Sequence, residues 1–311
     1  MNNKVLNIIK WVWLVAVLAG AGFYFFQNQE TVLALIRQLS ALRIGASLFL
    51  LLVAKLFIVL LVQFSVEAEG LALNFWETLG IYGSTALGKY IPGGVWHFVG
   101  RFAVYRAKGL NSKQTLRAFI LENIWMLSAA LVVGLAALLF YRLDLLNAWL
   151  GINLSTGIAI GLFILALCLW IAGLILVRGF IGRQTQMSIR PVWQVALAGI
   201  LLWIFAGLSF FVMFEAFPLQ EFGLFIGGYA ISWAVGYLAV FAPGGVGIRE
   251  TMLVLVFASI GSAAQISVYA AMNRIIWVAA ELLFGLAGYL QNPAKPGLSE
   301  EAPPDRPAQT Q

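Results

Sequence analysis

The residues of this chain that could do chemistry are charged and amide side chains set inside long apolar segments. They are Lys55, Glu122, Asn123, Asn273, Arg274 and Glu281. A charged side chain that faces lipid costs about 2.5 kcal/mol or more, so these groups must face inward or find partners. One interpretation is structural ion pairing, for example of Lys55 with Glu122 or with Glu281. The other is a polar lining that recognises a charged headgroup or relays protons.

A second group of candidate residues surrounds a motif that occurs twice. Pro-Gly-Gly-Val stands at 92–95 and again at 243–246, each time at the end of an apolar segment. Proline and glycine end helices, and unpaired backbone groups survive at membrane depth only where protein or a water-filled cavity surrounds them. The paired breaks therefore predict a central pathway or binding site. The candidate substrate- or lipid-binding residues are Pro92, Gly93, Gly94, His97, Arg101, Pro243, Gly244, Gly245, Arg249 and Glu250.

Arg101 and Arg249 follow the two breaks closely, and Glu250 stands next to Arg249. A helix that begins at either break would present free backbone N–H groups beside an arginine, which is how proteins hold phosphate. The pattern therefore favours headgroup binding by both arginines. In the alternative, each arginine only extends its charged head to the membrane surface. His97 also has two interpretations, packing at a turn or carrying a proton.

Several kinds of chemistry are excluded by the residue inventory. Cys168 is the only cysteine and His97 the only histidine, so neither a disulfide framework nor a His/Cys zinc site can be assembled. The segment 83–90 nearly spells a nucleotide-phosphate loop, but Tyr90 stands where that loop needs Ser or Thr, and close helix packing by small residues explains it better. The net charge of +6 comes without an aromatic and basic module, which argues against nucleic acid. No catalytic constellation occurs, so we expect neither an enzyme nor a cofactor.

The elements that must position these residues are apolar helices. Of 311 residues, 62% are apolar and 10% charged, with a mean hydropathy of +0.92, which a water-soluble domain of this size could not sustain. About 20 apolar residues cross a bilayer core of about 30 Å. The runs that qualify are Trp11–Phe26, Ile44–Val62, Ala118–Phe140, Ile152–Val177, Val192–Phe214 and Ala264–Leu290. Two further runs, Phe75–Ile91 and Phe222–Ala242, end at the Pro-Gly-Gly breaks.

The first run and the segment after it need separate interpretation. Trp11–Phe26 could be a cleaved signal peptide, but no small-residue cleavage site follows it, so we expect a retained anchor. Between the first two spans, apolar residues recur at helical spacing over 32–42, with basic residues between them. This spacing predicts an interfacial amphipathic helix.

The two breaks belong to an internal repeat. They are 151 residues apart (243 − 92), and the same offset carries Gly134-Leu135-Ala136 onto Gly285-Leu286-Ala287 and 44–62 onto 195–213. One shared offset over several elements indicates duplication. We expect repeat A at about 44–140, repeat B at about 193–290 and a linking helix at 152–177, all in a single transmembrane domain of residues 1–290. The polar, proline-rich segment 291–311 should be a disordered tail.

The distribution of Lys and Arg predicts the orientation. Basic residues crowd the connections at 101–117 and 178–190, so both should be cytoplasmic, together with the N-terminus and the tail. These positions agree only if each broken segment enters and leaves on one side, the first from the cytoplasm and the second from outside. The sequence thus predicts an all-α polytopic membrane protein with about six spanning helices and two re-entrant or broken helices in two inverted repeats. In the alternative, the broken helices cross fully, which puts the N-terminal lysines or the basic loops outside.

Two motifs carry a resemblance to a known family: Lys89-Tyr90-Ile91-Pro92-Gly93-Gly94 followed by Arg101, and Ala242-Pro243-Gly244-Gly245-Val246-Gly247-Ile248-Arg249-Glu250. They resemble the lysylphosphatidylglycerol synthase transmembrane family, a flippase-type membrane region, over about residues 5–290. Arg274 after Asn273 is similar to the family's arginine in the last helix. The chain departs from the family at Glu122, Asn123 and Met126, where relatives often carry a Glu-Arg pair with a nearby Asp. The family's synthases use a large soluble domain, whereas about twenty residues follow the last span here, so we expect no aminoacyl transfer.

Two hypotheses about function follow. The first is a translocase of the cytoplasmic membrane that moves a phospholipid or a polyprenyl-linked lipid between leaflets, because inverted repeats, broken helices and arginines at the breaks are typical of such transport. The alternative is an accessory protein that binds lipid, or a partner lipid-modifying or glycosyl-transferring enzyme, without transporting anything. A leaflet-resolved lipid assay separates the two.

Overall fold

Every regular element is helical in the part of the chain that the computed structural model describes, namely residues 19, 23, 26, 29–90, 96–182, 190–215, 219–239 and 242–291. The α-helices are α2 (Gln29–Gln38), α3 (Ala41–Ala68), α4 (Phe75–Ala86), α5 (Trp96–Ala107), α6 (Ser112–Tyr141), α7 (Leu143–Leu150), α8 (Thr156–Gly182), α9 (Val192–Phe211), α10 (Phe222–Leu238), α11 (Ile248–Val256) and α12 (Ala263–Gln291). Short 3-10 helices are η1 (Leu87–Tyr90), η2 (Leu219–Glu221) and η3 (Pro243–Gly245). The predicted all-α class is therefore confirmed.

Five of these helices are long and apolar enough to cross a membrane, namely α3, α6, α8, α9 and α12. They coincide with five of the predicted spans, whereas Trp11–Phe26 extends over residues outside the described ranges. The predicted start of the linking helix at Ile152 is wrong, because α8 begins at Thr156. Gly151 takes a left-handed conformation (φ +65°) and ends α7, a short helix that the sequence did not predict.

Local sequence fixes where two of the helices begin. The Asn74 side chain accepts a hydrogen bond from the backbone N–H of Glu77, and the Glu77 side chain accepts one from the N–H of Asn74. Asn111 and Gln114 make the same reciprocal pair at the start of α6. These capping boxes satisfy N–H groups that have no partner inside the helix.

The order of helices occurs twice along the chain. The series α3, α4, α5 and α6 is followed, after α7 and α8, by α9, α10, α11 and α12. The first helices begin at Ala41 and Val192 and the last at Ser112 and Ala263, so both pairs are 151 residues apart (192 − 41 and 263 − 112). A 3-10 helix stands between α4 and α5 and between α10 and α11. The helix starts thus follow the offset of the sequence repeat. We call α3–α6 the first unit and α9–α12 the second unit.

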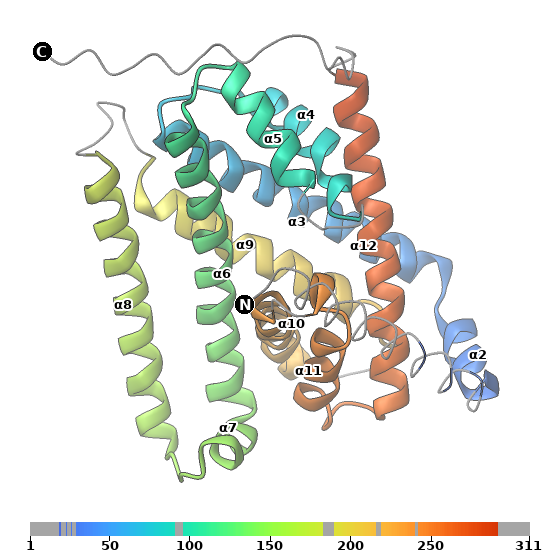
Figure 1. Cartoon of the computed structure of the whole chain (residues 1–311). Helices are drawn as coiled ribbons and strands as arrows, with labels where there is room; N and C mark the ends of the chain where they lie inside the picture. The colour runs from blue at the N-terminus through green and yellow to red at the C-terminus, as the bar shows by residue number, and fades with distance from the viewer. Residues whose placement is uncertain are drawn as a thin grey trace, which may run out of the picture.

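The two units interlock in the bundle (Figure 1). α4 and α5 lie toward one end, and α10 and α11 lie toward the other. α6 runs from the first end to the second, and α12 runs the opposite way. α3 packs on α9, α4 on α12, and α10 on α6. The broken helix of each unit is therefore covered by the last helix of the other unit.

Glycines permit these close crossings. A Cβ at Gly83 of α4 would come within 2.2 Å of the carbonyl oxygen of Phe284 in α12. A Cβ at Gly227 of α10 would come within 2.4 Å of the carbonyl oxygen of Val133 in α6. Small residues at a crossing let two backbones approach, so Gly83 and Gly227 are packing residues.

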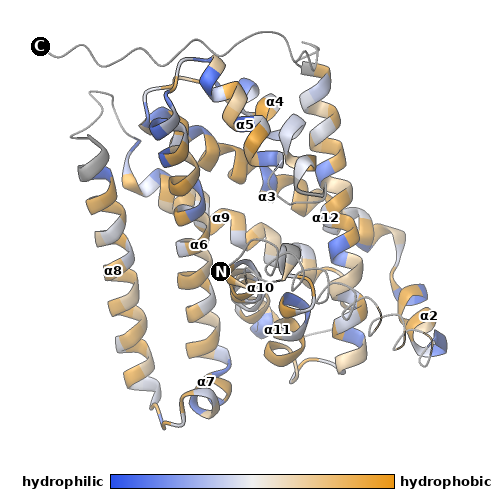
Figure 2. Cartoon of the chain, viewed as in Figure 1, coloured by the Kyte–Doolittle hydropathy of each residue, from blue (hydrophilic) through white to orange (hydrophobic). Residues whose placement is uncertain are grey.

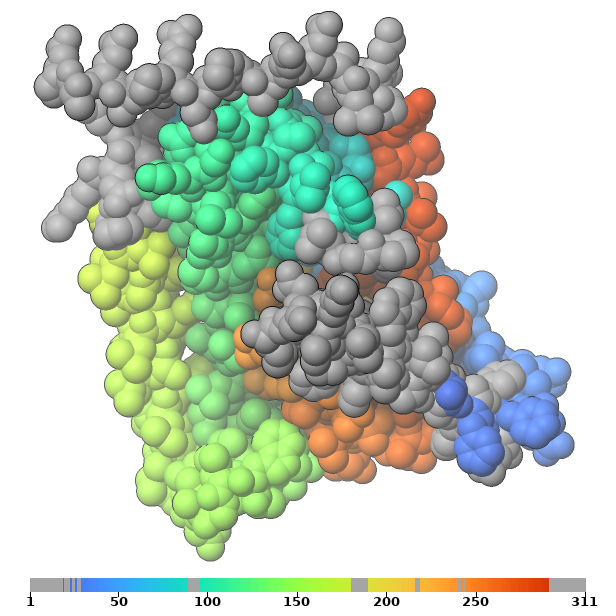
Figure 3. Space-filling view, in the orientation of Figure 1, coloured from blue at the N-terminus to red at the C-terminus, as the bar shows by residue number. Residues whose placement is uncertain are grey.

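α8 lies at the margin of the bundle, beside α6 (Figure 1). Only 6% of its most apolar window is buried, against 56% for α9. Its surface is hydrophobic along most of its length (Figure 2), and it forms one edge of the molecule (Figure 3). A long helix that is apolar and exposed is compatible with an integral membrane protein, because lipid would cover it.

α2 matches the helix predicted at 32–42 for most of its length. It projects from the side of the bundle opposite α8 (Figure 1). Val32 in α2 and Leu39 just after it are both buried. The helix is confirmed, and its position at a membrane interface stays a prediction.

Candidate binding site

The second Pro-Gly-Gly break separates α10 from α11. Pro243, Gly244 and Gly245 form η3, and φ is +59° at Gly244, +68° at Gly245 and +86° at Gly247. A residue with a Cβ is strained at such angles. A Cβ at Gly245 would also lie 2.8 Å from the carbonyl oxygen of Gly236 in α10. Glycine is thus required here both for the backbone angles and for the close return of the chain onto α10.

Glu250 and Arg274 hold this break in place. One carboxylate oxygen of Glu250 accepts a hydrogen bond from the backbone N–H of Gly247 at 2.8 Å. The other oxygen lies 2.6 Å from Arg274 Nη1, and Arg274 Nη2 donates to the carbonyl oxygen of Gly244 at 2.7 Å. Charge-assisted hydrogen bonds are strong. The structure therefore brings these predicted site residues together, and in these contacts they fix the backbone of the break.

Lys55 and Glu281 form a fully buried ion pair between the two units. Lys55 Nζ in α3 lies 2.9 Å from Glu281 Oε1 in α12, and the two side chains are 0% and 1% exposed. Trp277 Nε1 donates to the same oxygen at 2.7 Å, and Lys55 Nζ lies 4.5 Å from the centre of the Trp277 ring. Of the two partners proposed for Lys55 from the sequence, Glu281 is confirmed and Glu122 is wrong.

Arg101 is the partner of Glu122. Arg101 Nη2 in α5 lies 2.8 Å from Glu122 Oε1 in α6, with side chains 5% and 3% exposed. The guanidinium lies 5.2 Å from the ring of Phe119 and 5.7 Å from the ring of Tyr82. Arg101 thus points into the protein and does not extend to the surface.

Arg249 is buried without such a partner. It is the second residue of α11 and is 9% exposed. Its guanidinium carbon lies 4.6 Å from the ring of Tyr229 and 5.8 Å from the ring of Trp277. Across the described ranges, no carboxylate lies within ion-pair distance of it. The two arginines that the sequence treats alike therefore differ in their electrostatic surroundings.

The two predicted asparagines are hydrogen-bonded inside the bundle. Asn273 Oδ1 accepts a hydrogen bond from the Tyr229 hydroxyl at 2.8 Å, and its amide nitrogen lies 3.2 Å from Ser209 Oγ. Asn123 Oδ1 accepts one from the Tyr237 hydroxyl. Both asparagines join the second unit's α10 to a long helix, α12 or α6.

The first break is described only at its edges. Pro92, Gly93 and Gly94 lie outside the described residues. His97, the second residue of α5, packs its ring 3.9 Å from that of Phe98. This contact agrees with packing at a turn, and a proton-carrying role for His97 stays a prediction.

Aromatic residues beside the charges are the part of the site that sequence reasoning missed. Tyr82 lies within electrostatic range of Glu281 and of the pair formed by Arg101 and Glu122, so the buried charges of the two units are neighbours. Tyr229 and Trp277 cover Arg249. Aromatic residues are common in this chain, so single tyrosines gave no signal. The repeat could have found Tyr82 and Tyr229, which occupy similar places in α4 and α10.

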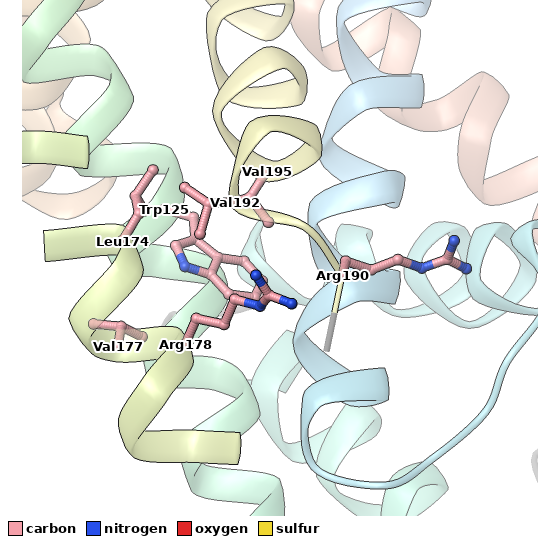
Figure 4. A pocket seen from close by; sticks show the side chains of 7 residues that line it. All are labelled: Trp125, Leu174, Val177, Arg178, Arg190, Val192 and Val195. Atoms are coloured by element: carbon pink, nitrogen blue, oxygen red, sulfur yellow. The ribbon is translucent and has the colours of Figure 1, made fainter. Parts of the chain in front are cut away.

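A pocket lies apart from these charges, between α6, α8 and the start of α9 (Figure 4). Its lining residues are Trp125, Leu174, Val177, Arg178, Arg190, Val192 and Val195. Arg190 points away from the other six in Figure 4, and its Nε lies 2.8 Å from Glu67 Oε2. The pocket is therefore a mainly apolar crevice near the margin of the bundle.

The corner between α6 and α7 carries a separate ion pair outside the spans. Arg142 donates hydrogen bonds to Asp144 and to the carbonyl oxygen of Leu255 at the end of α11. These bonds from Arg142 lower the pKa of Asp144. This pair ties the end of the first unit to α11.

Among the residues that the structure describes, no group of three His, Cys, Asp or Glu side chains could hold a metal ion. Comparison of the sequence with models of known protein families gives no match, and comparison with curated proteins gives none either.

Proposed function

We propose that this integral membrane protein moves the headgroup of a lipid or of a lipid-linked molecule across the cytoplasmic membrane. One observation carries the proposal: a helix break lined by Arg249, Glu250 and Arg274 lies within a bundle of apolar helices. Irregular backbone and buried charges are expensive in lipid, and in transporters they mark the substrate site.

The arrangement of the units supports this proposal. Transporters built from inverted repeats place their sites near the membrane midplane, where broken helices from the two repeats meet. Here the element order repeats, α6 and α12 run in opposite directions, and the broken helices lie toward opposite ends (Figure 1). We infer two inverted repeats, with six spanning helices and two re-entrant breaks, and with both termini in the cytoplasm. The resemblance to the lysylphosphatidylglycerol synthase transmembrane family points the same way and is part of the proposal.

A second candidate function is an accessory protein that binds lipid or a partner enzyme without transport. The pairs Lys55–Glu281 and Arg101–Glu122 favour it, because their charges are balanced within the chain. Balanced buried pairs need no substrate to explain them.

Leaflet-resolved transport separates the two functions. The protein is reconstituted into vesicles that carry phosphatidylglycerol with a fluorescent headgroup-proximal label in both leaflets, and an impermeant quencher is added outside. We expect quenching to pass the outer-leaflet fraction at a rate well above that of protein-free vesicles. Cys168→Ala, a change at an exposed residue of α8, is the matched control and should behave like the parent. Quenching that stops at the outer leaflet in every sample favours the accessory function.

A further inference from the structure

A trio of residues recurs in the two units. In the first unit it comprises Tyr82, Arg101 and Glu122, and in the second unit it comprises Tyr229, Arg249 and Asn273. The offsets between members are 147 (229 − 82), 148 (249 − 101) and 151 (273 − 122). Each tyrosine is on the helix before a break, each arginine is on the helix after it, and each third member is on the last helix of the unit. The trios therefore occupy equivalent places.

The trios differ in their third member. Glu122 gives Arg101 a carboxylate at 2.8 Å, which neutralises the arginine. Asn273 stands in the equivalent place in the second unit and instead accepts a hydrogen bond from Tyr229 at 2.8 Å. An amide carries no charge, so the second trio keeps the positive charge of Arg249.

The carboxylates nearest to Arg249 in sequence and structure are engaged elsewhere. Glu250, its neighbour, binds Arg274 and the N–H of Gly247. Glu281 binds Lys55 and the indole of Trp277. Lys55, Arg249 and Arg274 thus face two carboxylates, and one positive charge remains over the described residues of this cluster.

That remaining charge is held in a shape suited to an oxyanion. Arg249 is nine-tenths buried and lies over the ring of Tyr229, which orients its planar guanidinium. The first N–H groups of α11 have no acceptor within the helix, and they stand beside the arginine at the glycine break. Guanidinium and helix N-terminus together are a common way to hold phosphate.

We propose that Arg249 binds one phosphate-type anion per chain, either the phosphodiester of a lipid headgroup or free phosphate, which takes the place of the carboxylate that Glu122 supplies in the first unit. The proposal names the ligand class of the site proposed above and rests on that function only for the ligand's passage across the membrane. Arg101 is a structural residue, since its charge is already balanced.

The test adds the missing carboxylate. Detergent-solubilised full-length protein is titrated calorimetrically with inorganic phosphate and, separately, with dihexanoyl phosphatidylglycerol. The variants are Asn273→Glu and its uncharged match Asn273→Gln, which has the same length. We expect the parent and Asn273→Gln to bind within about threefold of each other, and Asn273→Glu to bind at least about tenfold more weakly, since its carboxylate would pair with Arg249. Binding of the lipid alone identifies a lipid headgroup, and binding of both probes identifies the phosphate group itself.

Two results overturn the proposal: no binding of either probe by the parent, or equal binding by Asn273→Glu and Asn273→Gln. If Asn273→Glu does not fold, Arg249→Gln against Arg249→Lys gives the same test, with binding expected to fall by about tenfold or more in Arg249→Gln and less in Arg249→Lys. Binding without lipid transport would remove the proposed function and leave the anion site standing. Transport that is unaffected by Asn273→Glu would remove the anion site and leave the function standing.

Discussion

The two buried arginines, Arg101 and Arg249, differ in what a neutral substitution leaves behind. Arg101→Gln leaves the Glu122 carboxylate buried without a counter-charge, which costs about 3–5 kcal/mol. Arg249→Gln removes a charge that has no carboxylate partner, and loses ring contacts of about 0.5–2 kcal/mol. We therefore expect Arg101→Gln to lower the thermal unfolding midpoint in detergent much more than Arg249→Gln. Equal losses in the two variants would contradict the difference in partners.

The ion pair of Lys55 and Glu281 gives a second prediction. Each single neutral variant, Lys55→Met or Glu281→Gln, should lose about 3–5 kcal/mol, because one buried charge is left alone. The double variant should lose clearly less than the sum, since both charges are gone. Unfolding free energies from denaturant titration of the four proteins give the coupling. Additive losses would mean that the pair does not act as a unit.

At this scale the sequence identifies charged residues but not their partners. Lys55, Arg101 and Glu281 are conspicuous because charges are rare in apolar helices. Their pairing depends on how helices far apart in the chain pack, and Lys55 and Glu281 are 226 residues apart. The contrast between Arg101 and Arg249 was also hidden, because it depends on one Glu-to-Asn difference on other helices.

Helix crossings give a prediction at the scale of elements. Gly83→Ala places a Cβ against the backbone of α12 and should cost about 1–3 kcal/mol, because backbone atoms cannot move aside easily. Gly45→Ala is the matched control, since it lies in α3 with nothing within 4 Å of the new Cβ. We expect it to leave stability unchanged or slightly higher, because alanine favours helix. Unfolding midpoints measured in one detergent compare them, and a harmless Gly83→Ala would argue against the close crossing of α4 and α12.

The elements themselves are largely predictable from hydropathy. The spans α3, α6, α9 and α12 are found because long apolar runs have few other uses, and the break after α10 is found because Pro-Gly-Gly ends a helix. α7 was missed because its eight residues are too short to leave a periodic signal. Its end at Gly151 depends on a left-handed residue that hydropathy does not report.

The orientation of the whole molecule can be measured with one cysteine. Lys113 is exposed at the start of α6, in the basic connection that we place in the cytoplasm. In a Cys168→Ala background, Lys113→Cys should react with an impermeant thiol reagent only after the cells are opened. Labelling from outside intact cells would contradict the proposed orientation and the re-entrant breaks with it.

The central claim at the scale of the molecule is that the break beside Arg249 is the route of a headgroup across the membrane. The most direct measurement is the initial rate of leaflet exchange of labelled phosphatidylglycerol in vesicles that contain equal amounts of parent, Asn273→Gln or Asn273→Glu protein. The account predicts similar rates for the parent and Asn273→Gln, and a rate at least about tenfold lower for Asn273→Glu, a loss of about 1.4 kcal/mol in transition-state stabilisation. Equal rates for Asn273→Glu and Asn273→Gln, at values above those of protein-free vesicles, would contradict it.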